Sequence, residues 1–180
     1  IEYRIKLIRN ESIGKYKLDT SSSNNWARPA TLNTELNTTY LNSLDSTSKS
    51  MIGQAKYYLG GKDVTWNNGY VDTPLQFYSY ERKTQNTTSN EFYNGTNPNN
   101  WVGKLGIMYL SDYGYASSNC ENKKIWDDSN PSNDIRACND TNWLYNIKKD
   151  EWLLPQRAGN NGFAFDVYSN GTVSRYCNVG

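Results

Sequence analysis

The residues of this chain that could do chemistry are three cysteines, Cys120, Cys138 and Cys177, in a sequence without histidine. Without imidazole, the chain lacks the usual base for a serine or cysteine nucleophile and a common zinc ligand. No two cysteines stand in a CxxC or zinc-ribbon spacing, so the pattern favours one disulfide and one odd cysteine. We expect the disulfide to join Cys120 and Cys138, and two free thiols in a cytosolic protein are the alternative.

The odd cysteine, Cys177, has more than one interpretation. It could pair with a residue outside this sequence, or lie buried as a small apolar side chain. Arg175 could activate its thiol, but a catalytic nucleophile also needs further partners, and the sequence offers none. We therefore expect the protein not to be an enzyme.

The loop between the first two cysteines is rich in oxygen ligands. Its sequence WDDSNPSND lacks the spacing of an EF-hand, but hard cations such as calcium take carboxylate and amide oxygens. A solvated, turn-rich loop is the alternative, because the same residue types dominate turns. Calcium is the one cofactor considered, and its candidate ligands are Asp127, Asp128, Asn130 and Asp134.

Composition limits the class of protein that has to position these residues. At 180 residues the chain is expected to form a single domain over 1–180, and its net charge of +1 does not indicate a nucleic-acid partner. Tyrosine (15) and tryptophan (6) are abundant, and about one residue in seven is asparagine. These residue types suit a recognition surface, and a β-rich domain with many surface loops is the alternative of equal weight. The expected disulfide indicates an extracellular location. Since no signal peptide or membrane span is visible, we expect a segment of a longer exported protein.

The first half of the chain predicts one helix among short strands. Leu32, Leu36 and Tyr40 recur every fourth residue, which predicts a helix from near 26–29 to about Leu44. Residues 62–100 are poor in aliphatic side chains and predict long loops with a strand or two. Strands are expected at Ile1–Arg9, where one face should be buried, at Lys15–Leu18 and at Met51–Leu59.

The second half predicts mainly strands. The apolar run Trp101–Tyr109 predicts a central strand, Ser111–Ser118 a turn, and Asn142–Ile147 a short helix capped by Asp140 or Thr141. Asn170-Gly171 predicts a hairpin with a type I′ turn. The remaining strands are expected at Glu151–Leu154, Gly162–Tyr168 and Val173–Cys177. One helix followed by many short strands indicates an α+β domain.

Several segments resemble a group of bacterial surface proteins that carry a prepilin-like helix ahead of a similar domain. They are LIRNESIGKYKLDT, the AsnTrp–ThrLeuAsn helix, GKLGIMYLSDYGYA, the cysteine pair around AsnTrpLeu, and TrpLeuLeuPro before FAFDVYSNGTVS. The last third, from Trp152 to Thr172, is similar to the ending of C-type-lectin-like domains, which include formylglycine-generating enzymes and phage variable proteins. The resemblance implies a C-type-lectin-like fold, with short antiparallel strands, one or two helices and long loops.

The resemblance also implies a ligand face, because such domains bind through their final loops and hairpin. Flat rings and short amides suit contacts with sugars or protein surfaces. Trp143 and Phe163 are expected in the core instead. The implied ligand-binding residues are Tyr145, Gln156, Arg157, Asn160, Asn161, Tyr176 and Asn178.

The expected function is therefore adhesion or recognition on a bacterial cell surface or pilus-like appendage. The expected partner is a protein or glycan ligand on another surface, with no membrane contact by this segment. One alternative is a structural pilin-like subunit that packs against other filament subunits. A formylglycine-generating-type oxidase is the less favoured enzymatic alternative, since the chain has neither a second late cysteine nor histidine.

Overall fold

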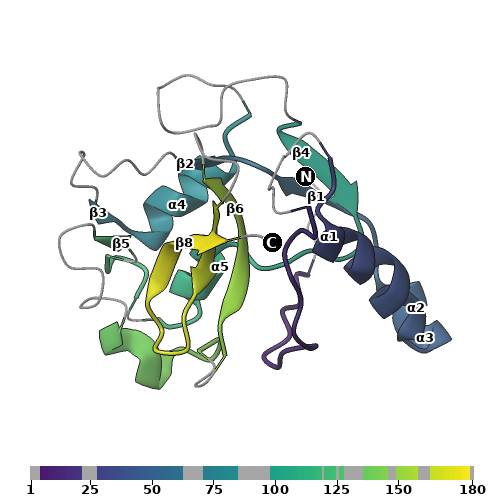
Figure 1. Cartoon of the computed structure of the whole chain (residues 1–180). Coiled ribbons are helices and arrows are strands. Elements are labelled where there is room, and N and C mark those ends of the chain that lie inside the picture. Colours follow the sequence, from purple (N-terminus) through teal and green to yellow (C-terminus); the bar gives the residue numbers. More distant parts are fainter. Residues whose placement is uncertain are drawn as a thin grey trace.

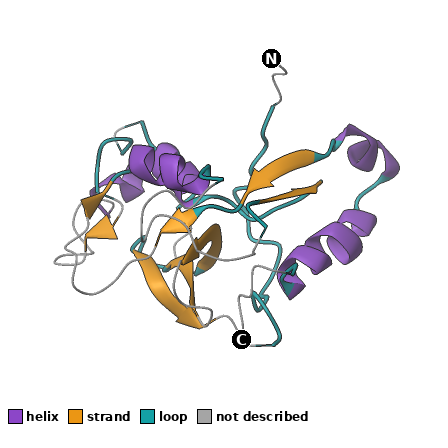
Figure 2. Cartoon of the chain, turned by 90° about the horizontal axis from the view of Figure 1, so that it is seen from above, coloured by secondary structure: helices purple, strands orange, loops and turns teal. Residues whose placement is uncertain are grey.

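The computed structural model shows a mixed arrangement of helices and small sheets, which confirms the α+β class (Figure 1). The four-stranded sheet and the helices α4 and α5 form one half of the molecule. The helices α1 to α3 and the strands β1 and β4 form the other half, as the view from above also shows (Figure 2). The structure describes residues 5–21, 28–62, 71–84, 98–118, 120–124, 126–127, 136–145, 149–157 and 163–178.

The predicted early helix is confirmed, with one irregularity. It is a continuous run of α1 (Thr31–Glu35), the π-helical segment η1 (Leu36–Tyr40) and α2 (Leu41–Ser43). Leu32 and Leu36 are buried, as their spacing predicts. A further short helix, α3 (Ser46–Met51), begins at the N-cap Asp45, whose carboxylate accepts a hydrogen bond from the Ser48 amide at 2.9 Å.

The largest sheet has the order β2-β6-β7-β8. Its strands are β2 (Gly61–Lys62), β6 (Glu151–Arg157), β7 (Phe163–Val167) and β8 (Val173–Asn178). β2 runs parallel to β6, and the other pairs are antiparallel, so the three predicted C-terminal strands are confirmed. Two smaller antiparallel sheets pair β1 (Ala55–Tyr58) with β4 (Asn100–Gly103) and β3 (Val71–Asp72) with β5 (Trp126–Asp127).

The C-terminal hairpin is confirmed, but its turn is not type I′. The Tyr168 amide donates to the Thr172 carbonyl at 2.9 Å, and the Gly171 amide donates to the Tyr168 carbonyl at 2.8 Å. The loop therefore has three residues, Ser169 to Gly171, rather than two. Gly171 has a φ of 79°, the left-handed conformation that such a three-residue loop requires at its last position.

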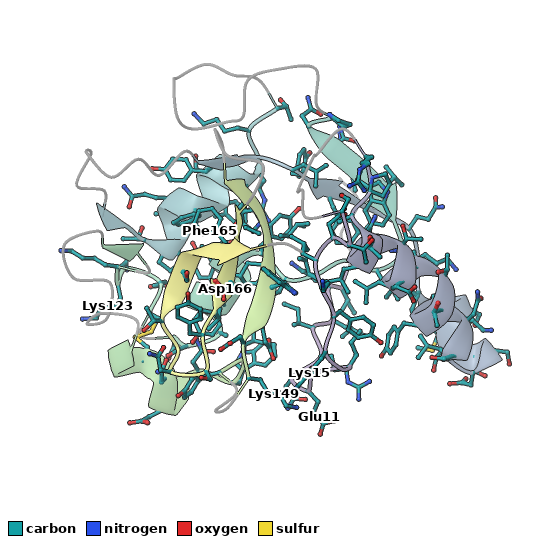
Figure 3. The ribbon with its side chains drawn as sticks, viewed as in Figure 1. Glu11, Lys15, Lys123, Lys149, Phe165 and Asp166 are labelled. Carbon is teal, nitrogen blue, oxygen red and sulfur yellow. A yellow bond between two sulfur atoms is a disulfide. The ribbon has the colours of Figure 1, made fainter. Side chains whose placement is uncertain are left out.

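Strand β7 is buried on both faces and separates the two clusters of the core. Ala164 packs with Leu18, Leu32 and Leu36 on one face. On the other face, Phe165 (labelled in Figure 3) stacks edge-on against Phe77 of α4 (Pro74–Glu81), and the ring centroids lie 5.7 Å apart. The sheet thus joins both halves of the molecule through alternating side chains of a single strand.

The predicted central strand Trp101–Tyr109 is wrong beyond its first three residues. β4 ends at Gly103, and within the described residues its sheet consists of β1 and β4. The amides of Lys104 and Leu105 instead donate to the side-chain oxygen of Asn37, at 3.3 and 3.1 Å. A side chain of η1 therefore takes the place of a neighbouring strand at this point.

The predicted turn Ser111–Ser118 is also wrong, because Leu110–Tyr115 forms the helix α5. The carboxylate of Asp112 accepts a hydrogen bond from the Tyr109 amide at 2.9 Å and so satisfies a donor before the first turn. A second unpredicted helix, α4, begins at Thr73 with a full capping box to Gln76 and with proline at its first position. The 62–100 region thus holds a helix as well as the strand β3.

Three further predictions are wrong or only partly right. In the described part of Ile1–Arg9 there is no strand, and Ile5 and Leu7 are 91% and 89% exposed, because none of the described elements covers their face. Lys15–Leu18 is not a strand either, although Leu18 is buried. Met51–Leu59 is a strand only over β1, since Met51 ends α3.

The predicted helix at Asn142–Ile147 lies too late in the chain. A 3₁₀ helix, η2 (Arg136–Thr141), precedes it, and 142–145 form a turn. The side chain of Asn142 explains the stop, because its oxygen accepts from the Leu144 amide at 2.9 Å while its nitrogen donates to the Tyr113 carbonyl at 2.8 Å. None of the helices in the described ranges has both the length and the apolar character that crossing a bilayer requires.

Candidate functional site

A cavity of about 160 Å³ lies where the helical run meets the β1–β4 sheet, and we call it the aromatic pocket. Its helical side is formed by Leu32 and Leu36, together with the segment that enters α1. Tyr57 of β1 and Trp101 of β4 form its aromatic wall, and Leu154 of β6 also lines it. The pocket therefore collects residues from distant parts of the sequence, from Leu18 to Leu154.

Two glycines allow the aromatic wall of this pocket to form. Tyr57 and Trp101 are directly opposite each other across the β1–β4 pair, with ring centroids 5.4 Å apart and planes tilted by 34°. A Cβ atom at Gly103 would collide with the indole of Trp101, and one at Gly106 would lie 2.7 Å from the Tyr57 ring. Each ring thus lies against a backbone that has no side chain, which holds the rings in place.

An ion pair between Asp19 and Arg28 lines one side of the pocket. The guanidinium lies 2.9 Å from one carboxylate oxygen and donates to the other at 3.1 Å. The Asp19 side chain is buried, whereas that of Arg28 is 43% exposed. Burial alone would raise the pKa of Asp19, but hydrogen bonds from Arg28 and Ser21 outweigh it and lower this pKa to about 2. The pair therefore carries opposite charges at neutral pH and neutralises itself.

Three further polar side chains of the pocket each make a hydrogen bond to the protein. The Tyr57 hydroxyl donates to the Lys104 carbonyl at 3.3 Å. The Asn33 side-chain oxygen accepts from Asn37 at 3.1 Å, and Asn100 donates to the Asn99 side chain at 2.6 Å. The interior that remains for a ligand is consequently dominated by apolar and aromatic surface.

A second notable group is the buried carboxylate of Glu81, the last residue of α4. It accepts hydrogen bonds from the Ser111 amide, at 2.9 Å, and from the Ser111 hydroxyl. Arg82 donates to it at 3.2 Å, and the same guanidinium stacks on the Tyr78 ring. Burial raises the pKa of Glu81 to about 7, although these hydrogen bonds and the Arg82 charge act in the opposite direction.

The position of Glu81 indicates a structural rather than a chemical role. Its side chain is completely buried, and it does not line the aromatic pocket. The Ser111 amide that it binds belongs to the first turn of α5, so the carboxylate serves as an N-terminal cap for that helix. It thereby ties α4 to α5.

The structure does not bring all the predicted ligand residues together. Gln156 and Arg157 end β6, and Tyr176 and Asn178 lie toward the end of β8, so these four share one end of the sheet. Tyr145 lies at the other end, where its hydroxyl donates to the Ser169 carbonyl of the hairpin loop at 3.2 Å. Asn160 and Asn161 lie outside the described residues. The prediction that Trp143 belongs to the core is wrong, because its side chain is 53% exposed, and the side chain of Phe163 lies outside the described part.

The predicted cysteine pair is present, whereas the candidate metal ligands lie largely outside the described residues. Cys120 and Cys138 are at disulfide distance, with Cα atoms 6.0 Å apart, and both are buried. Cys177 lies on β8 opposite Ala164. Of the candidate calcium ligands, only Asp127 falls on a described element, β5, whereas Asp128, Asn130 and Asp134 do not. Within the described ranges, no three acidic, cysteine or histidine side chains gather as a metal site would require.

Sequence reasoning missed the aromatic pocket altogether. The spacing of Trp101, Gly103 and Gly106 is a usable signal, since glycines near a large ring mark close approach of a side chain to backbone. The pairing of Asp19 with Arg28 gives no comparable signal. Protein-family models, curated proteins and solved structures yield no match to this chain. Its function is therefore inferred from the geometry of the pocket.

Proposed function

We propose that this protein is a non-enzymatic ligand-binding domain, displayed on a bacterial cell surface or pilus-like appendage, and that it holds its ligand in the aromatic pocket. The observation that carries the proposal is the pocket itself, a cavity of about 160 Å³ walled by Tyr57 and Trp101. Concave, largely apolar sites with a few placed polar groups are where proteins bind ligands. Protein interiors are close-packed, so a cavity with no function would be expected to be filled by side chains.

The extracellular location is supported by the pair Cys120–Cys138, because disulfides persist in oxidising compartments. A C-type-lectin-like architecture is part of the proposal. It is supported by the α+β class and by the late disulfide followed by the antiparallel C-terminal hairpin. The proposed binding site differs from the ligand face that the resemblance implies, because the pocket lies between the helical run and β1–β4.

A binding assay with a blocked pocket tests this function. Ala30 lines the pocket at the start of α1, and Ala30→Leu places an isobutyl group there. Gly53→Leu is the matched control, since a Cβ at Gly53 has no atom within 4 Å. We expect the wild type and Gly53→Leu to bind the same members of a protein and glycan array, and Ala30→Leu to lose that binding. Binding that survives in Ala30→Leu would place the site elsewhere.

The second candidate function is a structural pilin-like subunit, which one observation favours. Ile5 and Leu7 are almost fully exposed on the N-terminal segment, while Lys6 between them binds Asp112 and Ile8 packs against the core. Neighbouring subunits of a filament would cover such an apolar edge. An array without any bound member, together with self-association that Ile5→Ser and Leu7→Ser abolish, would favour this alternative.

A further inference from the structure

We infer that the aromatic pocket takes a single uncharged aromatic side chain from a polypeptide partner. This inference rests on the proposed function and names the chemistry of its ligand. It follows from three properties of the pocket: its size, its aromatic wall and the pairing of its polar groups.

The size of the pocket matches one ring. A cavity of about 150 Å³ in another protein holds a benzene molecule, and the aromatic pocket measures about 160 Å³. Sites for whole small molecules are larger, roughly 300–1,000 Å³. In protein interfaces, by contrast, one tryptophan or tyrosine commonly fills a small, well-packed pocket and supplies much of the binding free energy. The volume therefore favours a side chain over a free metabolite.

The aromatic wall favours a flat ring. Tyr57 and Trp101 are held at a centroid distance of 5.4 Å, and both line the pocket, so a third ring can pack against their faces or edges. Aromatic rings attract one another in offset or edge-to-face geometry beyond their apolar contact. Leu32, Leu36 and Leu154 provide apolar contacts on the remaining sides.

The pairing of the polar groups favours an uncharged ligand. Asp19 and Arg28 neutralise each other through two short contacts, and a charged ligand would compete with one of them. Tyr57, Asn33 and Asn100 already bond to the protein. A sugar buries many hydroxyl groups, each of which needs a partner. The pocket offers few such partners, so the structure favours protein over glycan as the ligand class.

Titration of the whole chain with small probes tests the inference. The probes are N-acetyl-phenylalanine amide, N-acetyl-lysine amide, toluene and methyl glucoside, and the readout is the chemical shifts of the amides of residues that line the pocket. We expect saturable shifts with the phenylalanine probe and with toluene, and no shifts with the lysine probe or the glucoside. Trp101→Leu should lower the affinity for the phenylalanine probe about tenfold, as the loss of an aromatic contact predicts.

Two controls separate a binding effect from loss of folding. Trp143→Leu removes an exposed indole outside the pocket and should leave the titration unchanged. Ala30→Leu leaves both rings in place but fills the cavity, and it should abolish the shifts even if Trp101→Leu fails to fold.

Three outcomes would overturn the inference. Saturable shifts with methyl glucoside, and none with the phenylalanine probe, would assign the pocket to glycans while leaving the proposed function intact. Binding of toluene alone would show that the pocket admits a free ring but not one carried on a chain. Absence of shifts with every probe would refute an aromatic side chain as the ligand. The array comparison of Ala30→Leu with the wild type decides separately whether the pocket binds any ligand.

Discussion

Replacing Glu81 with glutamine should change how the stability of this protein depends on pH. Burial raises the pKa of this carboxyl from its ordinary value of 4.5 to about 7 in the folded chain. Since a pKa difference of one corresponds to about 1.4 kcal/mol, this difference corresponds to about 3 kcal/mol in the free energy of unfolding. The side chain is fully buried, so solvent does not screen the effect.

The sign follows from which state binds the proton more tightly. Below about pH 4.5 the Glu81 carboxyl is protonated in the folded and unfolded chain alike, and its contribution to stability is complete. As the pH rises toward 7, the unfolded chain loses the proton first, because the folded chain has the higher pKa. About 3 kcal/mol of stability is therefore lost by the time the pH exceeds 7.

Urea unfolding of the wild type and of Glu81→Gln, between about pH 4 and pH 8, measures this loss. Glutamine keeps the shape and stays neutral, so the variant should become more stable relative to the wild type as the pH rises, by about 3 kcal/mol in total. Glu11→Gln is the matched control, because it makes the same substitution at an exposed side chain. A constant difference for Glu81→Gln would refute the reasoning. So would a carboxyl signal of Glu81 that titrates near pH 4.5.

Three further variants have defined effects. Asp19→Asn should lower the free energy of unfolding by about 1–2 kcal/mol at neutral pH, because solvent screens part of the ion pair at the 43% exposed side chain of Arg28. Urea unfolding should show that this difference disappears as the pH falls from 3.8 toward 2. Thr73→Ala should cost about 1 kcal/mol in a thermal melt, since it removes the cap of α4. Replacing Cys120 and Cys138 with serine should cost about 3 kcal/mol, and a reductant should lower the melting temperature of the wild type but not of this variant.

The C-terminal third was predictable because its signals are local. Phe163 to Val167 alternate in a way that only a strand satisfies, and Asn170-Gly171 marks a turn whichever hairpin type forms. Helix α4 was equally accessible, because Thr73, Pro74 and Gln76 hold the positions of a cap, a first-turn proline and a capping box. The low aliphatic content of 62–100 concealed it.

The centre of the chain was not predictable in the same way. The apolar run after Trp101 fits a strand by pattern, yet the Asn37 side chain, more than 60 residues away, binds the backbone at Leu105. Glu81 caps the first turn of α5 from 30 residues away. The aromatic pocket depends on residues from 18 to 154 meeting in space, and no local pattern reports such a meeting. Tertiary contacts therefore decided what local propensity left open.

The contacts of Asn37 also decide which production host suits this protein. The side-chain nitrogen of Asn37 donates to the backbone carbonyl of Leu105 at 2.9 Å and to that of Asn33 at 3.0 Å. Asn37, Thr38 and Thr39 form an acceptor triplet for N-linked glycans, and a eukaryotic secretory pathway modifies such triplets as the chain is made. A sugar at this nitrogen would stand between η1 and the segment that carries Gly106 and the pocket wall. Protein from a host without N-glycosylation, or the Thr39→Ala variant from a host that has it, keeps the hydrogen bonds of the Asn37 side chain to Leu105 and Asn33.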